Sequence, residues 1–240
     1  MGNKSSKKNI ASQSYAASPV ARSYRYGEPR QKPDVVEESD PNPENFKIVM
    51  VIDESGSMEV IRDDIIGSIN TFIAAQQKEK GIVPTTFTLI KFNNSTKTII
   101  NNKGLNDVKT LAKEDYSPSG GTALFDAIGD TIRKWNKVKN VLMVIVTDGQ
   151  ENASKYYSKN EITEMIESKK KNNGWTYVYL SNDLSVAEQG ENIGLCTSGD
   201  VTNAVVRQER MGSYIMHDLN DATTTYRSGK SSVQKVLNKK

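Results

Sequence analysis

Two short apolar runs, each followed by an aspartate, constrain the fold of this chain more than any other feature. Residues 46–52 and 141–147 are mostly aliphatic, and Asp53 and Asp148 come directly after them. Continuous apolar runs of this length are typical of strands that helices cover on both faces of a parallel sheet. We therefore expect two central, adjacent strands whose carboxyl ends place both aspartates at one edge of the sheet.

The middle of the chain alternates between helical and strand patterns. Apolar residues recur at helical spacing after the first run, around residues 124–135, and over residues 160–171 and 184–190. Strand patterns cover residues 86–92, 96–101, 175–180 and 193–197, and the first two are close enough to form an antiparallel hairpin. This alternation predicts an α/β fold with a mostly parallel sheet, one antiparallel edge strand and helices on both faces.

The domain organisation follows from changes in composition along the chain. Residues 1–44 are rich in Ser, Pro, Asn and charged residues, which predicts a disordered or extended N-terminal arm. We expect one domain over residues 45–200, a C-terminal helix over residues 201–226 and a basic tail over residues 227–240.

The charge distribution and the rare residues exclude several function classes. The net charge of +3 comes from the two ends, so the globular middle is mildly acidic and has no basic patch interleaved with aromatic residues. We therefore expect no nucleic-acid partner. The single cysteine, Cys196, and the single histidine, His217, exclude an intrachain disulfide and zinc sites built from several thiolates or imidazoles. We expect Cys196 to be a core thiol in the last strand.

The first residues bear on where the protein acts. Met-Gly-Asn-Lys-Ser-Ser matches the N-myristoylation pattern and makes Gly2 a lipidation candidate, with Lys4, Lys7 and Lys8 as a basic second signal. A chance match to this short pattern is the alternative. No apolar run approaches the roughly 18 residues of a membrane span, and the start does not resemble a secretory signal. We expect an intracellular, cytoplasmic protein that either contacts a membrane through its N-terminus or is incorporated in a virion.

Oxygen-bearing side chains gather just past the predicted strand ends. Asp53, Ser55 and Ser57 follow the first apolar run, Thr122 lies in a Gly-Gly-Thr loop before a helix, and Asp148 follows the second run. Two carboxylates and three hydroxyls, with no His or Cys nearby, suit Mg²⁺, which prefers oxygen ligands and retains waters. So few carboxylates leave a position for an acidic oxygen from outside the chain. Each fragment alone is also typical of a helix N-cap or a simple turn.

These five positions, in this order, resemble the von Willebrand factor type A (vWA) domain with its metal-ion-dependent adhesion site (MIDAS). The resemblance covers residues 45–200, and the strings at residues 51–58 and 121–128 are similar to an intracellular branch of bacteria, phages and large viruses. It implies a doubly wound, Rossmann-like sheet of about six strands. It also implies Mg²⁺ or Mn²⁺ bound directly by Ser55 and Ser57, with Thr122, Asp53 and Asp148 bound directly or through water. A partner's Glu or Asp would complete the shell.

The function that these features favour is non-enzymatic, Mg²⁺-dependent protein binding, as in a scaffold or a virion-assembly component. The alternatives are a structural vWA domain whose metal site is vestigial or only stabilising and, less favoured, a metal-dependent hydrolase. The sequence has no recognisable general base, second metal cluster or phosphate loop, so we assign no catalytic residue. Asp126 and Asp130 are interpreted as a solvated helix face or local caps, and residues 150–152 as rim residues of the site.

Overall fold

The computed structural model describes residues 32, 34, 37, 44–79, 83–181, 183–195, 204–207 and 213–228. Within this set, the side chains of Leu184, Tyr226 and residues 204–207 and 213–218 are not described. The chain divides into residues 1–30 and 31–240, and every described residue belongs to the second unit. Gly2, Cys196 and most of the predicted N-terminal arm therefore lie outside the described residues, as does the side chain of His217.

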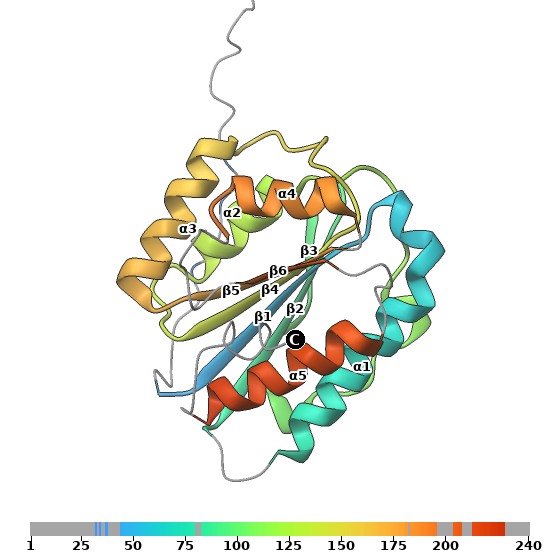
Figure 1. Cartoon of the computed structure of the whole chain (residues 1–240), viewed down its shortest axis with the longest axis vertical. Helices are drawn as coiled ribbons and strands as arrows, with labels where there is room; N and C mark the ends of the chain where they lie inside the picture. The colour runs from blue at the N-terminus through green and yellow to red at the C-terminus, as the bar shows by residue number, and fades with distance from the viewer. Residues whose placement is uncertain are drawn as a thin grey trace, which may run out of the picture. The chain divides into compact units, whose positions relative to one another are not determined.

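The described residues form a sheet of six strands in the order β3-β2-β1-β4-β5-β6. All neighbouring strands are parallel except β2 and β3, whose antiparallel pairing places β3 at one edge (Figure 1). This arrangement confirms the predicted fold class and the edge hairpin. The strands are β1 (Phe46–Asp53), β2 (Thr85–Phe92), β3 (Thr96–Gly104), β4 (Val141–Val146), β5 (Thr176–Ser181) and β6 (Ala204–Arg207).

Helices cover both faces of the sheet. Figure 1 shows α1 (Arg62–Lys78) and α5 (Ser213–Arg227) on one face, and α2 (Leu124–Lys134), α3 (Lys159–Asn173) and α4 (Leu184–Asn192) on the other. Short 3₁₀ helices lie at Gly56–Ile61, Leu105–Asp107 and Lys113–Asp115. No helix in the described part of the chain is long and apolar enough to span a membrane.

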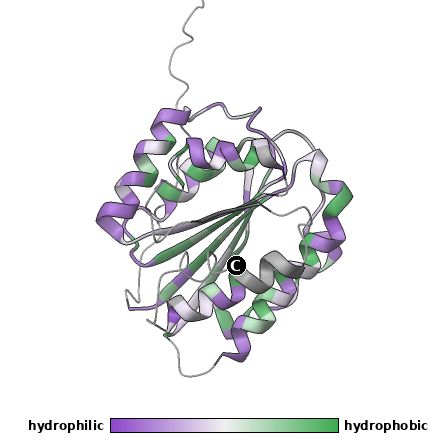
Figure 2. Cartoon of the chain, viewed as in Figure 1, coloured by the Kyte–Doolittle hydropathy of each residue, from purple (hydrophilic) through white to green (hydrophobic). Residues whose placement is uncertain are grey.

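The core explains why the first apolar run has no polar alternation. Ile48, Met50 and Ile52 pack into the cluster beneath α1 and α5, whereas Val49 and Val51 pack into the cluster beneath α2, α3 and α4. Figure 2 shows the same division, with apolar strands between helices whose outer sides are hydrophilic. Strands β1 and β4 are buried along their whole length and pair from Lys47–Val141 to Ile52–Val146, which confirms that they are central and adjacent.

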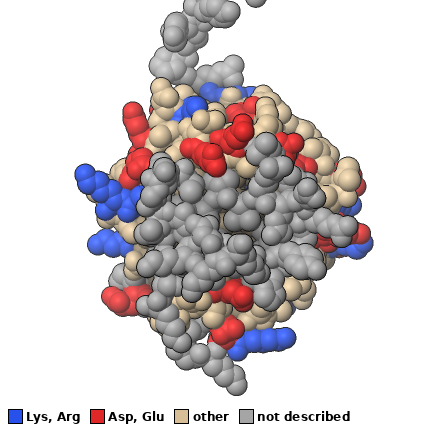
Figure 3. All heavy atoms as spheres, in the orientation of Figure 1, with Lys and Arg blue, Asp and Glu red and all other residues tan. Residues whose placement is uncertain are grey.

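The outer surface carries charges of both signs. On the face shown in Figure 3, Lys and Arg side chains alternate with Asp and Glu side chains around the rim that the described residues form. Electrostatic contacts on this part of the surface therefore depend on individual neighbouring residues, because opposite charges close together cancel at longer range.

The C-terminal region differs from the sequence prediction. The expected edge strand at 193–197 and the expected helix over 201–226 are both wrong in part. Ile193 and Leu195 are buried, but they end α4: Gly194 has φ +78°, and the N–H groups of Gly194 and Leu195 donate to Glu191 O (3.0 Å) and Gly190 O (3.2 Å). This is a Schellman helix end, whose buried apolar residues on either side of a glycine imitate strand alternation. The edge strand is β6, which pairs with β5, and α5 begins only at Ser213. Residues 196 and 197 lie outside the described residues.

Candidate metal centre

The two predicted aspartates lie at the same edge of the sheet because β1 and β4 end in register. Asp53 is fully buried, whereas Asp148 is partly exposed. Asp53 Oδ1 accepts a hydrogen bond from Ser55 N, and Asp53 Oδ2 accepts one from Thr147 Oγ1, both at 2.7 Å. The Asp53 carboxylate is therefore fixed from both sides, by the loop after β1 and by the residue after β4.

The two serines connect these aspartates through their hydroxyl groups. Ser55 Oγ lies 3.2 Å from Ser57 Oγ, and Ser57 Oγ donates to Asp148 Oδ1 at 2.7 Å. Ser55 is buried and Ser57 is exposed, so the pair extends from the interior to the surface. Adjacent ligands of an octahedral Mg²⁺ about 2.1 Å away lie about 3.0 Å apart, so the separation of the two hydroxyls suits a single ion.

Gly149 shows that Thr122 belongs to the same cluster. A Cβ atom added to Gly149 would lie 2.6 Å from Thr122 Oγ1 and 3.3 Å from Asp53 Oδ2. The Thr122 hydroxyl and the Asp53 carboxylate thus face the same small space. The structure brings together all five residues that the sequence singled out, and an added side chain at position 149 would force Thr122 to shift.

The loop that carries Thr122 is attached to its neighbours by backbone hydrogen bonds. Gly120, with φ +76°, accepts from Gly56 N at 3.0 Å, and Ser119 N donates to Glu54 O at 2.8 Å. Thr122 N donates to Asn152 Oδ1 at 2.9 Å. The three segments of the site are therefore linked to one another by hydrogen bonds of the protein itself, most of them between main-chain groups.

The electrostatics of the site favour a cation. Burial raises the pKa of Asp53 to about 6, and hydrogen bonds from Thr147 and Ser55 offset this only in part. Burial also raises the pKa of Asp148. Within the described residues, no Lys or Arg forms an ion pair with either aspartate, and the nearby Lys91 is instead paired with Glu54 at 2.7 Å. Two clustered carboxylates without a cationic partner fit a hard divalent ion.

The donor set also narrows the class of metal. The described residues contain no cluster of three or more His, Cys, Asp or Glu that could hold an ion, so a metal here would depend on hydroxyl oxygens. Serine and threonine hydroxyls with two carboxylates are ligands that Mg²⁺ and Mn²⁺ accept, whereas soft metals prefer thiolates.

Several residues that position the site were not recognised in the sequence. Thr147 Oγ1 donates a hydrogen bond to Asp53 Oδ2, and Tyr116 OH donates to the Asp53 carbonyl oxygen from 63 residues away. Glu151, considered only a rim residue, accepts hydrogen bonds from Phe125 N (2.9 Å) and Ser154 N (2.7 Å) and so caps the start of α2. Apart from the Ser154 contact, these hydrogen bonds join residues at least 26 positions apart, and no local pattern indicates them.

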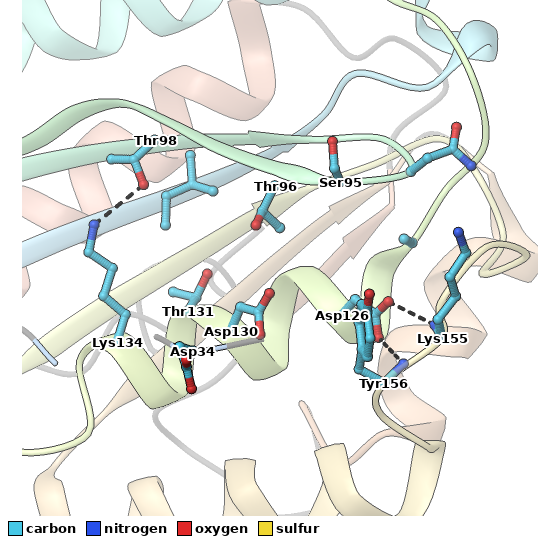
Figure 4. Close-up of a pocket in the computed structure, with 13 residues that line it drawn as sticks. Asp34, Ser95, Thr96, Thr98, Asp126, Asp130, Thr131, Lys134, Lys155 and Tyr156 are labelled. Atoms are coloured by element: carbon cyan, nitrogen blue, oxygen red, sulfur yellow. Dashed lines mark hydrogen bonds between the residues drawn. The ribbon is translucent and has the colours of Figure 1, made fainter. Parts of the chain in front are cut away.

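The interpretation of Asp126 is corrected by the structure. Asp126 is buried, and its carboxylate accepts from the N–H groups of Lys155 (2.7 Å), Tyr156 (2.9 Å) and Tyr157 (3.1 Å), two of which Figure 4 shows. It therefore neither faces solvent nor caps its own helix, but fixes the loop that follows Asp148 against α2. Asp130, one turn later, accepts from Tyr157 OH at 3.0 Å.

Solved structures resemble this fold at low sequence identity. The PilB minor pilin from Streptococcus sanguinis aligns with a TM-score of 0.59 and 14% identity over 79% of this chain and 64% of its own. A von Willebrand factor type A protein from Catenulispora acidiphila aligns with a TM-score of 0.53 and 16% identity, over 75% of this chain and 43% of its own. Proximal thread matrix protein 1 from the mussel byssus was solved with a zinc-occupied MIDAS motif. It aligns with a TM-score of 0.52 and 18% identity, over 75% of this chain and 46% of its own. The chain thus spans less than two thirds of each of these structures, and at this identity they support the fold alone.

Sequence comparison identifies the family. A search of curated protein sequences returned no match. The family model described as von Willebrand factor type A domain matches residues 47–232, which include β6 and α5 as well as the five clustered oxygen groups. The chain therefore belongs to the von Willebrand factor type A domain family.

Proposed function

We propose that this domain binds a protein partner through a divalent cation, Mg²⁺ or Mn²⁺, held by Asp53, Ser55, Ser57, Thr122 and Asp148. The ion would bridge these residues to an Asp or Glu side chain of the partner. The proposed activity is binding without catalysis, and it assigns the ion the role of an electrostatic link between two proteins.

One observation carries this proposal: a buried carboxylate and a second carboxylate share a hydroxyl-lined space with no described Lys or Arg paired to either. Such a group is costly to bury unless a positive charge accompanies it. The zinc-occupied MIDAS motif of the mussel byssus protein gives a precedent for a metal in this fold family. The main-chain links that hold the three segments support a site that is pre-organised for the ion.

The choice of ligands explains why the ion would attract a further acidic group. Three of the five ligands are neutral hydroxyls, so the ion retains more positive charge than one surrounded by carboxylates. Ser57 is exposed and Asp148 is partly exposed, which leaves the site open on that side. Without the ion, an incoming carboxylate would face Asp53 and Asp148, and attraction would become repulsion.

A capture experiment on the full chain tests this function. Immobilised protein is exposed to a host extract in Mg²⁺, in EDTA, and in EDTA followed by excess Mn²⁺, and the retained proteins are identified. We expect retention of a specific partner to be lost in EDTA and restored by Mn²⁺. Ser57→Ala should reproduce the loss, whereas Ser95→Ala, an exposed serine of the β2–β3 turn, should not. Capture that survives EDTA unchanged would favour a structural domain whose metal site is vestigial.

The proposed location of the protein rests on its N-terminal sequence. We propose an intracellular domain, in a scaffold or a virion assembly, that Gly2 acylation brings to a membrane. Mass spectrometry of the N-terminal peptide after expression in a eukaryotic host tests this step. A mass increase of one myristoyl group is expected on the wild-type chain and should be absent from Gly2→Ala.

A further inference from the structure

Two described residues of the N-terminal arm, Lys32 and Glu37, contact the domain beside α2 and the start of α3. Lys32 Nζ lies 2.6 Å from Glu161 Oε1 and 4.4 Å from the centre of the Tyr157 ring. Glu37 Oε2 lies 2.7 Å from Lys137 Nζ, and its Oε1 accepts from Asn136 Nδ2 at 3.4 Å. The arm is thus in contact with the domain at two separate points, both away from the five oxygen groups.

Asp34 lies between these two points and lines a groove. The groove has a volume of about 520 Å³ and lies between the β2–β3 hairpin and α2. Figure 4 shows Asp34 on the α2 side of the groove, where Asp130, Thr131 and Lys134 also line it. The arm therefore contributes part of the wall of this groove, and releasing the arm would widen the groove.

The charges of the arm are opposite to those of the surface residues that they contact. The positive Lys32 meets Glu161, while the negative Glu37 meets Lys137, so each contact joins opposite charges. The contact with Lys32 and the Ser158 N–H lower the pKa of Glu161 to about 2, and Lys137 lowers the pKa of Glu37. Shifting the arm along this surface would separate these pairs, so the charges fix one register.

The connection to β1 is long enough for the arm to reach this surface of its own chain. Lys47 N donates to Asn140 O at 3.2 Å, so the start of β1 lies beside the segment that follows Lys137. The eight residues between Glu37 and Phe46 can extend to about 30 Å, whereas the three steps from Lys137 to Asn140 span at most about 10 Å. A short tether of this kind gives the arm a high effective concentration at its own site.

The contacts are also exposed, which makes them reversible. The side chains are 34% and 44% exposed in the Lys32–Glu161 pair, and 77% and 41% exposed in the Lys137–Glu37 pair. Exposed ion pairs are individually weak and are screened by salt. An arm held by such contacts would dock at low ionic strength and would be released when ions or a competing segment occupied its partners.

We propose that the arm acts as an intramolecular ionic strap: Lys32 and Glu37 attach it beside α2 and the start of α3, and Asp34 thereby covers one side of the groove. The Lys32–Glu161 and Glu37–Lys137 ion pairs hold the strap in place. The short segment that joins Glu37 to β1 keeps the arm close to both partners. The strap is independent of the proposed metal function, because none of its contacts involves the five metal-site residues.

A charge-swap experiment on the full chain tests the strap, and ¹⁵N relaxation measures its result. The readout is the order parameter of the Asp34 and Glu37 amides, about 0.85 for rigid backbone and below 0.6 for flexible backbone. We expect rigid values at low salt in the wild-type chain and flexible values in Lys137→Glu and in Glu37→Lys. The double variant, Glu37→Lys with Lys137→Glu, should restore order because the pair is re-formed with exchanged signs.

Three further measurements test whether the arm is held by these particular charges and whether they belong to the same chain. Lys139→Glu makes the same charge change two residues further along an exposed segment and should leave the arm ordered. Salt at about 1 M, where the Debye length is about 3 Å, should release the arm of the wild-type chain. Order that falls on dilution of the protein would mean that a second copy supplies the arm. That result, or a double variant that stays flexible, would overturn the proposal.

Discussion

The metal centre and the strap surface are both built from charged and polar side chains, but they are held together in opposite ways. At the metal centre, Asp53 is buried and receives two hydrogen bonds of 2.7 Å from groups that are themselves fixed by strands. At the strap surface, Glu37 and Lys137 meet in solvent on flexible side chains. Burial and main-chain attachment, more than the number of charges, therefore decide which contacts are permanent.

The largest effect is expected where a buried carboxylate supports the site. Asp126→Ala leaves three backbone N–H groups of residues 155–157 without their acceptor, so the free energy of unfolding should fall by about 2–4 kcal/mol. Urea unfolding measures this change. Asp130→Ala is the matched control on the same helix, because Asp130 is half-buried and is bonded to Tyr157 OH, and it should cost about 1 kcal/mol. Equal losses in the two variants would contradict the view that Asp126 fixes the loop.

A smaller effect is expected from adding one methyl group at the centre of the site. Gly149→Ala would place a Cβ 2.6 Å from Thr122 Oγ1, and the resulting overpacking should destabilise the domain by about 1–3 kcal/mol. Gly67→Ala is the control, because nothing lies within 4 Å of its added Cβ on α1. This change should stabilise the helix by about 0.5–1 kcal/mol. If both variants shifted the urea midpoint in the same direction, the close approach of Thr122 to Gly149 would not exist in solution.

The smallest effect is expected at the strap surface. Lys137→Glu removes one exposed ion pair, so the free energy of unfolding should stay close to the wild-type value while the arm is released. Lys139→Glu should give a similar change in unfolding free energy without releasing the arm. A loss of stability in Lys137→Glu as large as that of Asp126→Ala, with none in Lys139→Glu, would show that the arm is an integral part of the core, and the contrast between the two regions would disappear.

The sequence predicted the central strands and the five oxygen groups because each signal is local. The apolar runs before Asp53 and Asp148 require burial on both faces, and parallel strands bring their carboxyl ends together. Thr122 was found only through its Gly-Gly-Thr loop, and its proximity to Gly149 is a tertiary contact that no local pattern indicates.

The remaining features depend on contacts between distant segments. Asp126 looks like a surface residue in a helical pattern, because its three N–H partners lie about 30 residues later in a loop. The strand β6 has only four residues and was missed, while the buried helix end at Ile193 and Leu195 imitates a strand. In both cases tertiary packing decides the outcome over local propensity.

Isothermal titration calorimetry of Mg²⁺ binding to the full chain tests the metal centre itself. We predict one site in the wild-type chain and an affinity at least about 10-fold lower in Asp148→Ala, with far-ultraviolet circular dichroism unchanged. Glu59→Ala, which also removes one negative charge from an exposed residue two positions after Ser57, should bind as the wild-type chain does. Equal Mg²⁺ affinity in Asp148→Ala and the wild-type chain would contradict the assignment of a metal centre at this edge of the sheet.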